Sequence, residues 1–519
     1  MPTGPSTFVV TADDLGAAID ALTERGFRFD GPADVHVTVL DTFDGRFHRA
    51  DLRLTVRDSP PLELVLSGDD VVPARVELDV APRWASDLPP GPFRLRVQAM
   101  IDVRALLPQL RVRATRTDAV CRDDEGHVVA TAVLLQDITV APGRATTTDD
   151  QPRPGAVIEV HGVIGSPKPA RRAVEALETL GLAARRCDAL AFLADAAGVV
   201  LGGFEASATV ALDPAMPAAE GVRDVLANLA ETIEANWQGT IDHLDPEFLH
   251  DLRIAVRRTR AVMTQTKSVL PPAVVTEAGE GFAWLGNLTG PARDLDVYLI
   301  EWDDYVRPLG SAAMAALAPV RALLEERQAL AHAALDTAMT SPAAARLMET
   351  WRTMLGQVAT SEDRGTHADR PLGQLVRRRI IRAQSKLIDR GRLITLDTPA
   401  EQVHDLRKDA KKLRYLLECF GSLLADGPRK QFVKRLKALQ DNLGEHQDAE
   451  VHVALIREIA ADIHQGTATT ETLLALGQLT ERLEQIRIAA RREFAEQFSV
   501  YDTSSTEHAF AAMLDFLDS

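Results

Sequence analysis

The C-terminal part of this chain repeats itself. Residues 248–260 (FLHDLRIAVRRTR) and residues 402–414 (QVHDLRKDAKKLR) align at an offset of 154 residues. The same offset, without a gap, places Gly290 on Gly444 and Asp294 on Asp448. A register shared from residue 248 to residue 297 predicts two similar helical bundles related by a pseudo-two-fold axis.

The sequence around this duplication has a helical texture. From about Pro217 onward, stretches rich in Ala, Leu, Arg and Glu carry apolar residues at helical intervals, and Gly and Pro retreat to a few positions. We therefore predict an all-α domain over residues 213–519, with repeat halves at about 217–365 and 366–519. The segment Asp213–Pro217 has the composition of a linker.

The first 212 residues have a different pattern. Short segments alternate apolar and polar residues, which is typical of half-buried strands. The segments are residues 35–40, 51–57, 62–66, 75–80, 93–97, 110–115 and 157–161. Helical spacing occurs at residues 12–26 and 170–182. We predict a separate α+β domain over residues 1–212, built on an antiparallel barrel-like sheet.

Composition limits the functional class. The formal net charge of -17 argues against a protein that coats nucleic acid with its whole surface. Three cysteines cannot build a disulfide framework. The N-terminal sequence lacks the basic region followed by an apolar region that marks a secretory signal. The longest weakly polar stretch, residues 189–204, is too short to span a bilayer. These features predict a cytoplasmic protein.

Basic residues gather on one face of each duplicated helix. At about 100° per residue, His250, Arg253 and Arg257 share a narrow stripe. The full set of candidate binding residues on the two stripes is His250, Arg253, Arg257 and Arg260, then His404, Arg407, Lys411 and Arg414. Arg258, Lys408 and Lys412 flank the stripes, and Arg378, Arg379 and Arg382 belong to a third basic run. Successive donors of this kind suit a linear polyanion, whereas the alternative is a solvated face with ion pairs.

No metal or other cofactor is expected at these helices. A zinc or di-iron site needs a second ligand at i+4, where His250 has Ile254 and His404 has Lys408. Asp294 and Asp448 are expected to have structural roles, such as orienting arginines.

These motifs resemble the two halves of a CHAD domain, the conserved-histidine α-helical domain. The strings that carry the likeness are residues 250–260 with 288–297, and residues 403–415 with 439–444 and Asp448. The resemblance implies two four-helix bundles around a basic channel that binds inorganic polyphosphate, and in some members association with polyphosphate granules. One departure is Asp409, which replaces the Ala255 of the first copy and puts a carboxylate next to the basic cluster.

The N-terminal half resembles a CYTH domain, the triphosphate tunnel fold, only weakly. Arginines alternate in residues 53–57, 94–96 and 111–113, so they would share one face of each strand. Such faces would line the lumen of a barrel or, on an open sheet, meet water. Active members of that family begin with Glu-x-Glu-x-Lys, which holds the metal, but this chain begins with Ser6-Thr-Phe-Val-Val10. We predict a degenerate, non-catalytic CYTH-like domain.

These observations favour a protein that binds inorganic polyphosphate in a basic groove without catalysis. The alternative is a metal-dependent triphosphatase that uses the N-terminal domain. Aromatic residues make up only 5% of the chain, and single-strand binders stack bases on aromatic side chains, so no specific nucleic acid partner is expected. No membrane partner is expected either. The sequence leaves the oligomeric state and the preferred chain length open.

Overall fold

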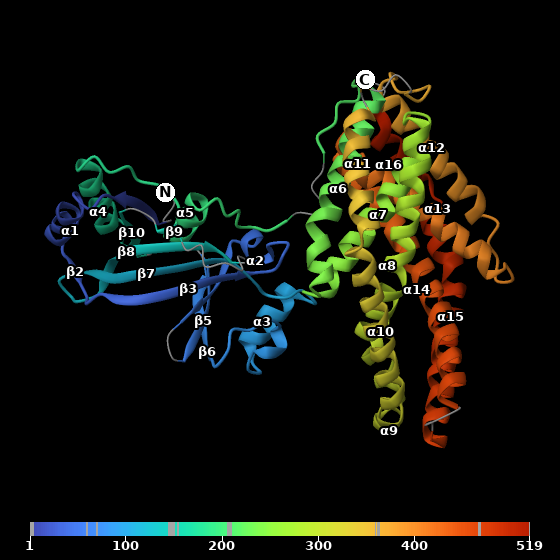
Figure 1. Ribbon diagram of the computed structural model, residues 1–519, viewed down its shortest axis with the longest axis horizontal. Coiled ribbons are helices and arrows are strands. Elements are labelled where there is room, and N and C mark those ends of the chain that lie inside the picture. The colour runs from blue at the N-terminus through green and yellow to red at the C-terminus, as the bar shows by residue number, and fades with distance from the viewer. Residues whose placement is uncertain are drawn as a thin grey trace. The chain divides into compact units, whose positions relative to one another are not determined.

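The computed structural model describes residues 5–58, 61–68, 71–143, 151–152, 155–163, 165–204, 210–358, 360, 364–464 and 469–517. The chain divides into two compact units, residues 1–205 and residues 206–519. The first unit is an antiparallel sheet with a few helices, and the second is entirely helical (Figure 1). No helix among the described residues is long and apolar enough to cross a membrane.

The described strands of the first unit belong to one antiparallel sheet, in the order β1-β10-β8-β7-β3-β4-β5-β6, with β2 beside β7 and β9 beside β8. Their bounds are β1 Ser6–Val10, β2 Phe27–Phe29, β3 Ala33–Asp41, β4 Leu52–Arg57, β5 Leu62–Gly68, β6 Val71–Leu78, β7 Leu107–Arg122, β8 Val128–Pro142, β9 Gln151–Pro152 and β10 Ala156–Gly162. Predicted strands at six of the seven segments are confirmed.

Helices cover part of this sheet. They are α1 Leu15–Glu24, α2 Arg46–Arg49, α3 Pro92–Ile101, α4 Pro167–Thr179 and α5 Ala189–Ala196. The helix α4 buries Ala170, Ala173 and Leu177 against the core formed with α1, β8 and β10. The helical spacing read at residues 12–26 and 170–182 is therefore confirmed.

The predicted strand at residues 93–97 is wrong, because this segment lies in α3. Pro92 occupies the first turn, where its missing N–H costs no hydrogen bond. The buried residues are Val97 and Ile101, four apart as on a helix, whereas Leu95 is 71% exposed. Three apolar residues in alternation are too short a pattern to separate a strand from a helix. Arg94 and Arg96 therefore do not belong to a strand face.

The second unit repeats its helices as well as its motifs. Its helices are α6 Ala218–Ile241, α7 Pro246–Thr266, α8 Pro272–Val306, α9 Ser311–Ala316, α10 Ala318–Met339, α11 Pro342–Val358, α12 Leu372–Gly391, α13 Ala400–Cys419, α14 Asp426–His464, α15 Thr470–Tyr501 and α16 Ser504–Leu514. The first residues of α6, α7 and α8 lie 154 positions before those of α12, α13 and α14. The duplication read from the sequence therefore extends to the helix starts.

Equivalent residues of the two repeats also contact each other. Pro217 and Pro371, which are 154 residues apart, form a β-bridge just before α6 and α12. Tyr298 of α8 and His452 of α14 are separated by the same interval, and their ring centroids lie 4.2 Å apart. A residue can meet its own counterpart only close to a two-fold axis, so these contacts place the predicted pseudo-two-fold axis between the repeats.

One apolar core joins the two repeats. A single cluster of buried residues draws on α6, α7, α8 and α11 of the first repeat and on α12, α13, α14 and α16 of the second. A second cluster packs α10 and the end of α8 against α14 and α15, which extend beyond the bundle (Figure 1). Leu212 and Met216, at the start of this unit, pack against the first cluster. The shared core fixes α7 and α13 relative to each other.

Candidate functional site

The two motif helices pack against each other and open a pocket beside them. The helices α7 and α13 are in direct contact. A pocket of about 340 Å³ lies where α7, α13 and α14 meet. Its basic lining residues are Arg258, Arg407, Lys411 and Arg414. The structure therefore brings cations of both motif helices to one place.

Arg257 and Lys411 form the centre of this cationic site. They are equivalent positions of the two repeats, 154 residues apart, and they are close enough for the charge of Arg257 to act on Lys411. Burial is the main cause that lowers the pKa of Lys411 to about 7, and the charges of Arg257, Arg407 and Arg253 lower it further, against the opposing effect of Asp448. Among the residues that the structure describes, neither Arg257 nor Lys411 pairs with a carboxylate. Arg257 and Lys411 are therefore neighbouring cations whose mutual repulsion Asp448 offsets only in part.

Arg253 and Arg407 flank this centre in a matching way. Arg253 Nη2 lies 3.5 Å from Asp294, and Arg407 Nη1 donates to Asp448 at 3.0 Å. The expectation that these aspartates orient arginines is confirmed in both repeats. Burial also lowers the pKa of Arg253, only partly offset by Asp294. Desolvated guanidiniums are strong partners for phosphate oxygens.

The repeated glycines make room for these guanidinium groups. A Cβ at Gly290 would lie 3.1 Å from Arg253 Nη1, and a Cβ at Gly444 would lie 3.5 Å from Arg407 Nη2. Each arginine therefore lies against the backbone of the neighbouring helix. This explains why the glycine recurs at the same offset as the arginine.

Arg258 and Arg414 are held by one carboxylate that links the repeats. Glu418 accepts from Arg258 Nη2 at 2.6 Å and from Arg414 Nε at 2.6 Å. Burial acts against the charge of Arg258, but Glu418 more than offsets it and the pKa of Arg258 is raised. These two arginines are therefore largely neutralised, in contrast to the central pair.

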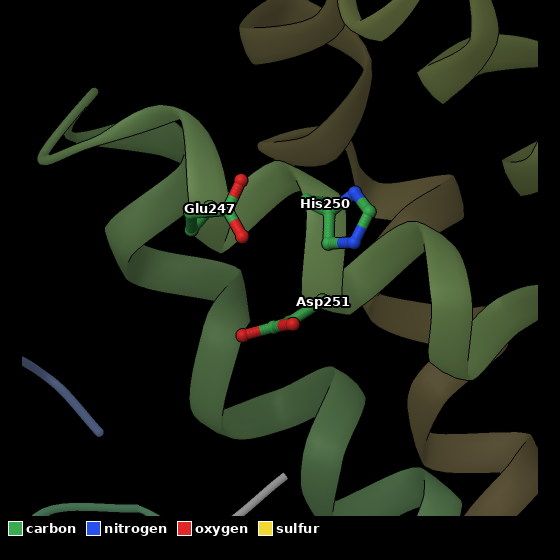
Figure 2. Close-up of side chains that lie close together, drawn as sticks. All are labelled: Glu247, His250 and Asp251. Atoms are coloured by element: carbon green, nitrogen blue, oxygen red, sulfur yellow. The ribbon is translucent and has the colours of Figure 1, made fainter. Parts of the chain in front are cut away.

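The two histidines have different surroundings. His404 Nδ1 donates to Gln447 Oε1 at 2.6 Å, which orients its ring from α14. His250 lies beside Glu247 and Asp251 at the start of α7, with one ligand atom from each residue within 4.8 Å of the others (Figure 2). This trio is the metal-ligand cluster found among the described residues, although the sequence predicted none. Arg293 already engages Glu247 at 3.4 Å, as expected of a structural cluster.

The remaining predicted residues do not line the pocket. Lys408 pairs with the exposed Asp405 at 3.2 Å, and Lys412 lies 3.6 Å from Asp409. Arg260 is exposed on α7, and its guanidinium lies against Gly286 of α8, whose carbonyl also accepts from Arg253 Nη1 at 3.2 Å. On α12, Arg378 and Arg382 are exposed, and Arg379 donates to Ser268 at 3.1 Å. Burial lowers the pKa of Arg379, with further lowering by Arg382 and Arg378, so this run is a separate basic patch.

Asp409 does not face the pocket. Its buried carboxylate accepts from Lys386 at 2.9 Å and from Arg390 at 2.7 Å, both on α12. It lies about 200° around α13 from Arg407, since successive residues turn by about 100°. The carboxylate that the sequence placed next to the basic cluster therefore neutralises cations between α12 and α13.

Replacement of Asp409 by Asn is expected to lower the free energy of unfolding by about 1–2 kcal/mol. Breaking a fully buried ion pair costs about 3–5 kcal/mol, but Lys386 and Arg390 are nearly half exposed and remain partly solvated. Urea denaturation measures this loss. Affinity for polyphosphate should stay unchanged, and a fall in affinity at unchanged stability would contradict this placement of Asp409.

The sequence did not predict the acidic and amide residues of the pocket. Glu418, Asp441, Glu445 and Asp448 line it together with Gln440. Only Asp448 was singled out by the repeat. Glu418 and Gln440 correspond to Thr264 and Gly286 in the first repeat. A comparison of the positions at which the two repeats differ could therefore have identified them as candidate site residues.

The geometry defines a duplicated α-helical domain with a cationic site at its pseudo-two-fold axis. Residues 224–457, which lie within the helical unit, match the family model of the CHAD domain. No curated protein matches the chain.

Several solved structures are similar to parts of the chain. A CHAD domain from the plant Ricinus communis has 28% identity and a TM-score of 0.46, covering 55% of this chain and 95% of its own. PptA from Streptomyces chartreusis has 19% identity and a TM-score of 0.43, and the match covers 55% of this chain and 99% of PptA. HpAC1 from Hippeastrum, a putative adenylyl cyclase described with a dominant triphosphatase activity, has 17% identity and a TM-score of 0.27, covering 38% and 95%.

Proposed function

We propose that the helical unit binds inorganic polyphosphate at the axis between α7 and α13, without cleaving it. The observation that carries the proposal is that neither Arg257 nor Lys411 pairs with a carboxylate among the described residues, although Arg253 and Arg407 lie beside them. Such crowding destabilises the empty site, since each charge loses water and gains like-charged neighbours. A chain of phosphates would supply the missing negative charge at several successive positions.

The surroundings favour phosphate chains over nucleic acids. The motif helices contribute a single aromatic residue to the pocket, Tyr415. Sequence-tolerant binding of single strands depends on stacking of successive bases on aromatic side chains. A site made of guanidinium and ammonium groups, with a net charge of -17 on the whole chain, would confine polyanions to one place.

A triphosphatase activity of the first unit is the rival proposal. Its opening strand β1 carries no carboxylate, and Glu159, opposite Thr7 in the sheet, lies 2.8 Å from His161. Arg53 and Arg57, predicted to share a cationic face, pair with Asp188 and Glu63. These pairs reduce the positive charge that a triphosphate would need. We therefore favour binding without cleavage, and the CYTH-like character of this unit stays a prediction.

The two functions separate in one titration. The full chain is titrated with long-chain polyphosphate and with single-stranded RNA of equal charge, at two salt concentrations, while phosphate release is assayed with and without Mg²⁺. We expect tighter binding of polyphosphate than of RNA, an affinity that falls steeply with salt, and no release. Mg²⁺-dependent release of phosphate would establish the triphosphatase activity instead. Equal affinity for RNA would contradict the proposed preference for polyphosphate over nucleic acid.

A further inference from the structure

The pocket between α7, α13 and α14 is not simply basic. Its α14 wall presents Gln440, Asp441, Gly444, Glu445 and Asp448. The equivalent positions of α8 are Gly286, Asn287, Gly290, Pro291 and Asp294, of which only the last is charged. The second repeat therefore has two carboxylates that the first repeat lacks, and an amide at the position of Gly286.

Gln440 presents an unused donor in this pocket. Its side chain is only 6% exposed, and its Oε1 accepts from Arg414 Nη1 at 3.3 Å, which fixes the orientation of the amide. Its Nε2 is buried and has no hydrogen-bond partner among the residues that the structure describes. A buried amide donor left unpaired is costly, so this position calls for an acceptor from a ligand. A phosphate oxygen has the required chemistry.

Asp441 and Glu445 act in the opposite sense. They lie one helical turn apart on α14, and both are exposed. Within the described part of the chain, no cation pairs with either carboxylate, whereas Glu418 and Asp448 are engaged by arginines. Two free carboxylates on the wall of a phosphate site would repel a bare phosphate.

We propose that this pocket holds a phosphate group together with a divalent cation bound to that phosphate, with Asp441 and Glu445 as the protein's ligands to the cation. The inference rests on the proposed polyphosphate binding. It adds that the part of the polyphosphate in this pocket is bound together with a divalent cation. Mg²⁺ typically keeps several waters and is held by one or two carboxylates plus phosphate oxygens, so no preformed cage of ligands is required. The Gln440 amide and Lys411 then contact the same phosphate from the basic side.

The proposal predicts an unusual sign for the effect of Mg²⁺. At a purely cationic site, Mg²⁺ competes with the protein for phosphate oxygens and lowers affinity. At a wall with free carboxylates, Mg²⁺ removes a repulsion and adds ligands, so affinity rises. Tripolyphosphate is the suitable probe, because a short chain cannot engage the whole basic stripe while it fills the pocket.

The test compares tripolyphosphate affinity with EDTA and with saturating Mg²⁺ by calorimetry on the full chain. In the wild type, Mg²⁺ should strengthen binding by about 5- to 100-fold, the usual range of coupling between two ligands. In the double variant Asp441→Asn, Glu445→Gln, binding in EDTA should tighten and Mg²⁺ should weaken it. The charge-matched control Glu326→Gln, Glu349→Gln, on α10 and α11, should behave as the wild type.

Each outcome decides between the proposals. If Mg²⁺ weakens binding in the wild type, or strengthens it equally in the Asp441/Glu445 variant, the cation site is disproved. The variant Gln440→Met, checked for folding by its melting temperature, should bind tripolyphosphate more weakly both in EDTA and in Mg²⁺. Unchanged affinity would show that the Gln440 amide does not contact the phosphate. Binding of long-chain polyphosphate in EDTA tests the proposed function alone, because no divalent cation is present. If long-chain polyphosphate does not bind, the proposed function is wrong. If it binds, the tripolyphosphate titrations test only the proposed cation site.

Discussion

Simultaneous replacement of Arg253, Arg257, Arg407 and Lys411 by alanine is expected to weaken long-chain polyphosphate binding by at least about 100-fold. Each charge-assisted hydrogen bond contributes about 1.5–3 kcal/mol, and four cations at the axis are removed together. The steepness of the salt dependence should fall as well, because each lost phosphate contact lowers the slope of log affinity against log salt by about 0.7 on a single strand. Calorimetric titration at several salt concentrations measures both quantities.

A charge-matched variant distinguishes this site from general electrostatics. Lys168, Arg172, Arg346 and Arg492 are exposed cations on α4, α11 and α15. Their replacement by alanine removes the same total charge and should change affinity by less than about threefold, since none of them lines the pocket and salt screens the charges of exposed side chains. Equal losses in the two variants, with both folded, would mean that no localised site exists.

Polyphosphate binding is expected to take up about one proton per protein at pH 8.5. Burial and the charges of Arg257, Arg407 and Arg253 lower the pKa of free Lys411 to about 7, with Asp448 opposing. A bound phosphate chain reverses this effect and returns the pKa toward the ordinary value of 10.5. Affinity should therefore fall by up to about tenfold per pH unit between pH 7 and 10. Calorimetry in buffers of different ionisation enthalpy counts the protons directly.

The same shift affects the protein without ligand, and its sign follows from linkage. Between pH 7 and 10.5 the unfolded chain keeps the Lys411 proton and the folded chain has released it, so stability rises with pH across this range. The control variant Lys411→Arg keeps the charge but does not titrate, and should bind with no proton uptake. Uptake that persists in this variant would assign the proton to another group.

The sequence was most informative where the two repeats agree. The offset of 154 residues predicted the paired helices, because the same register of apolar residues builds the same packing twice. It also predicted structural roles for Asp294 and Asp448, such as orienting arginines, and the structure identifies those arginines as Arg253 and Arg407. Helical periodicity then placed the central cations on one stripe, and the structure brings those stripes together.

The sequence was least informative about which cations remain uncompensated. The two helices present Arg258, Lys408, Lys412 and Arg414 in the same pattern as the central residues. Three of them pair within α13 at helical spacing: Lys408 with Asp405, Lys412 with Asp409 and Arg414 with Glu418. Arg258 pairs with the same Glu418 from the other repeat, a contact that periodicity does not predict. The same limit applies to Asp409, whose other cations lie on α12. Pairing of this kind depends on tertiary packing, and only the structure separates neutralised cations from free ones.

The most direct test of the central claim is a crystal structure of the full chain with a polyphosphate of defined length. The account predicts phosphate density along the axis between α7 and α13, with oxygens within hydrogen-bond distance of Arg257 and Lys411. Density confined to the exposed Arg378 and Arg382 of α12, or to the sheet of the first unit, would contradict it.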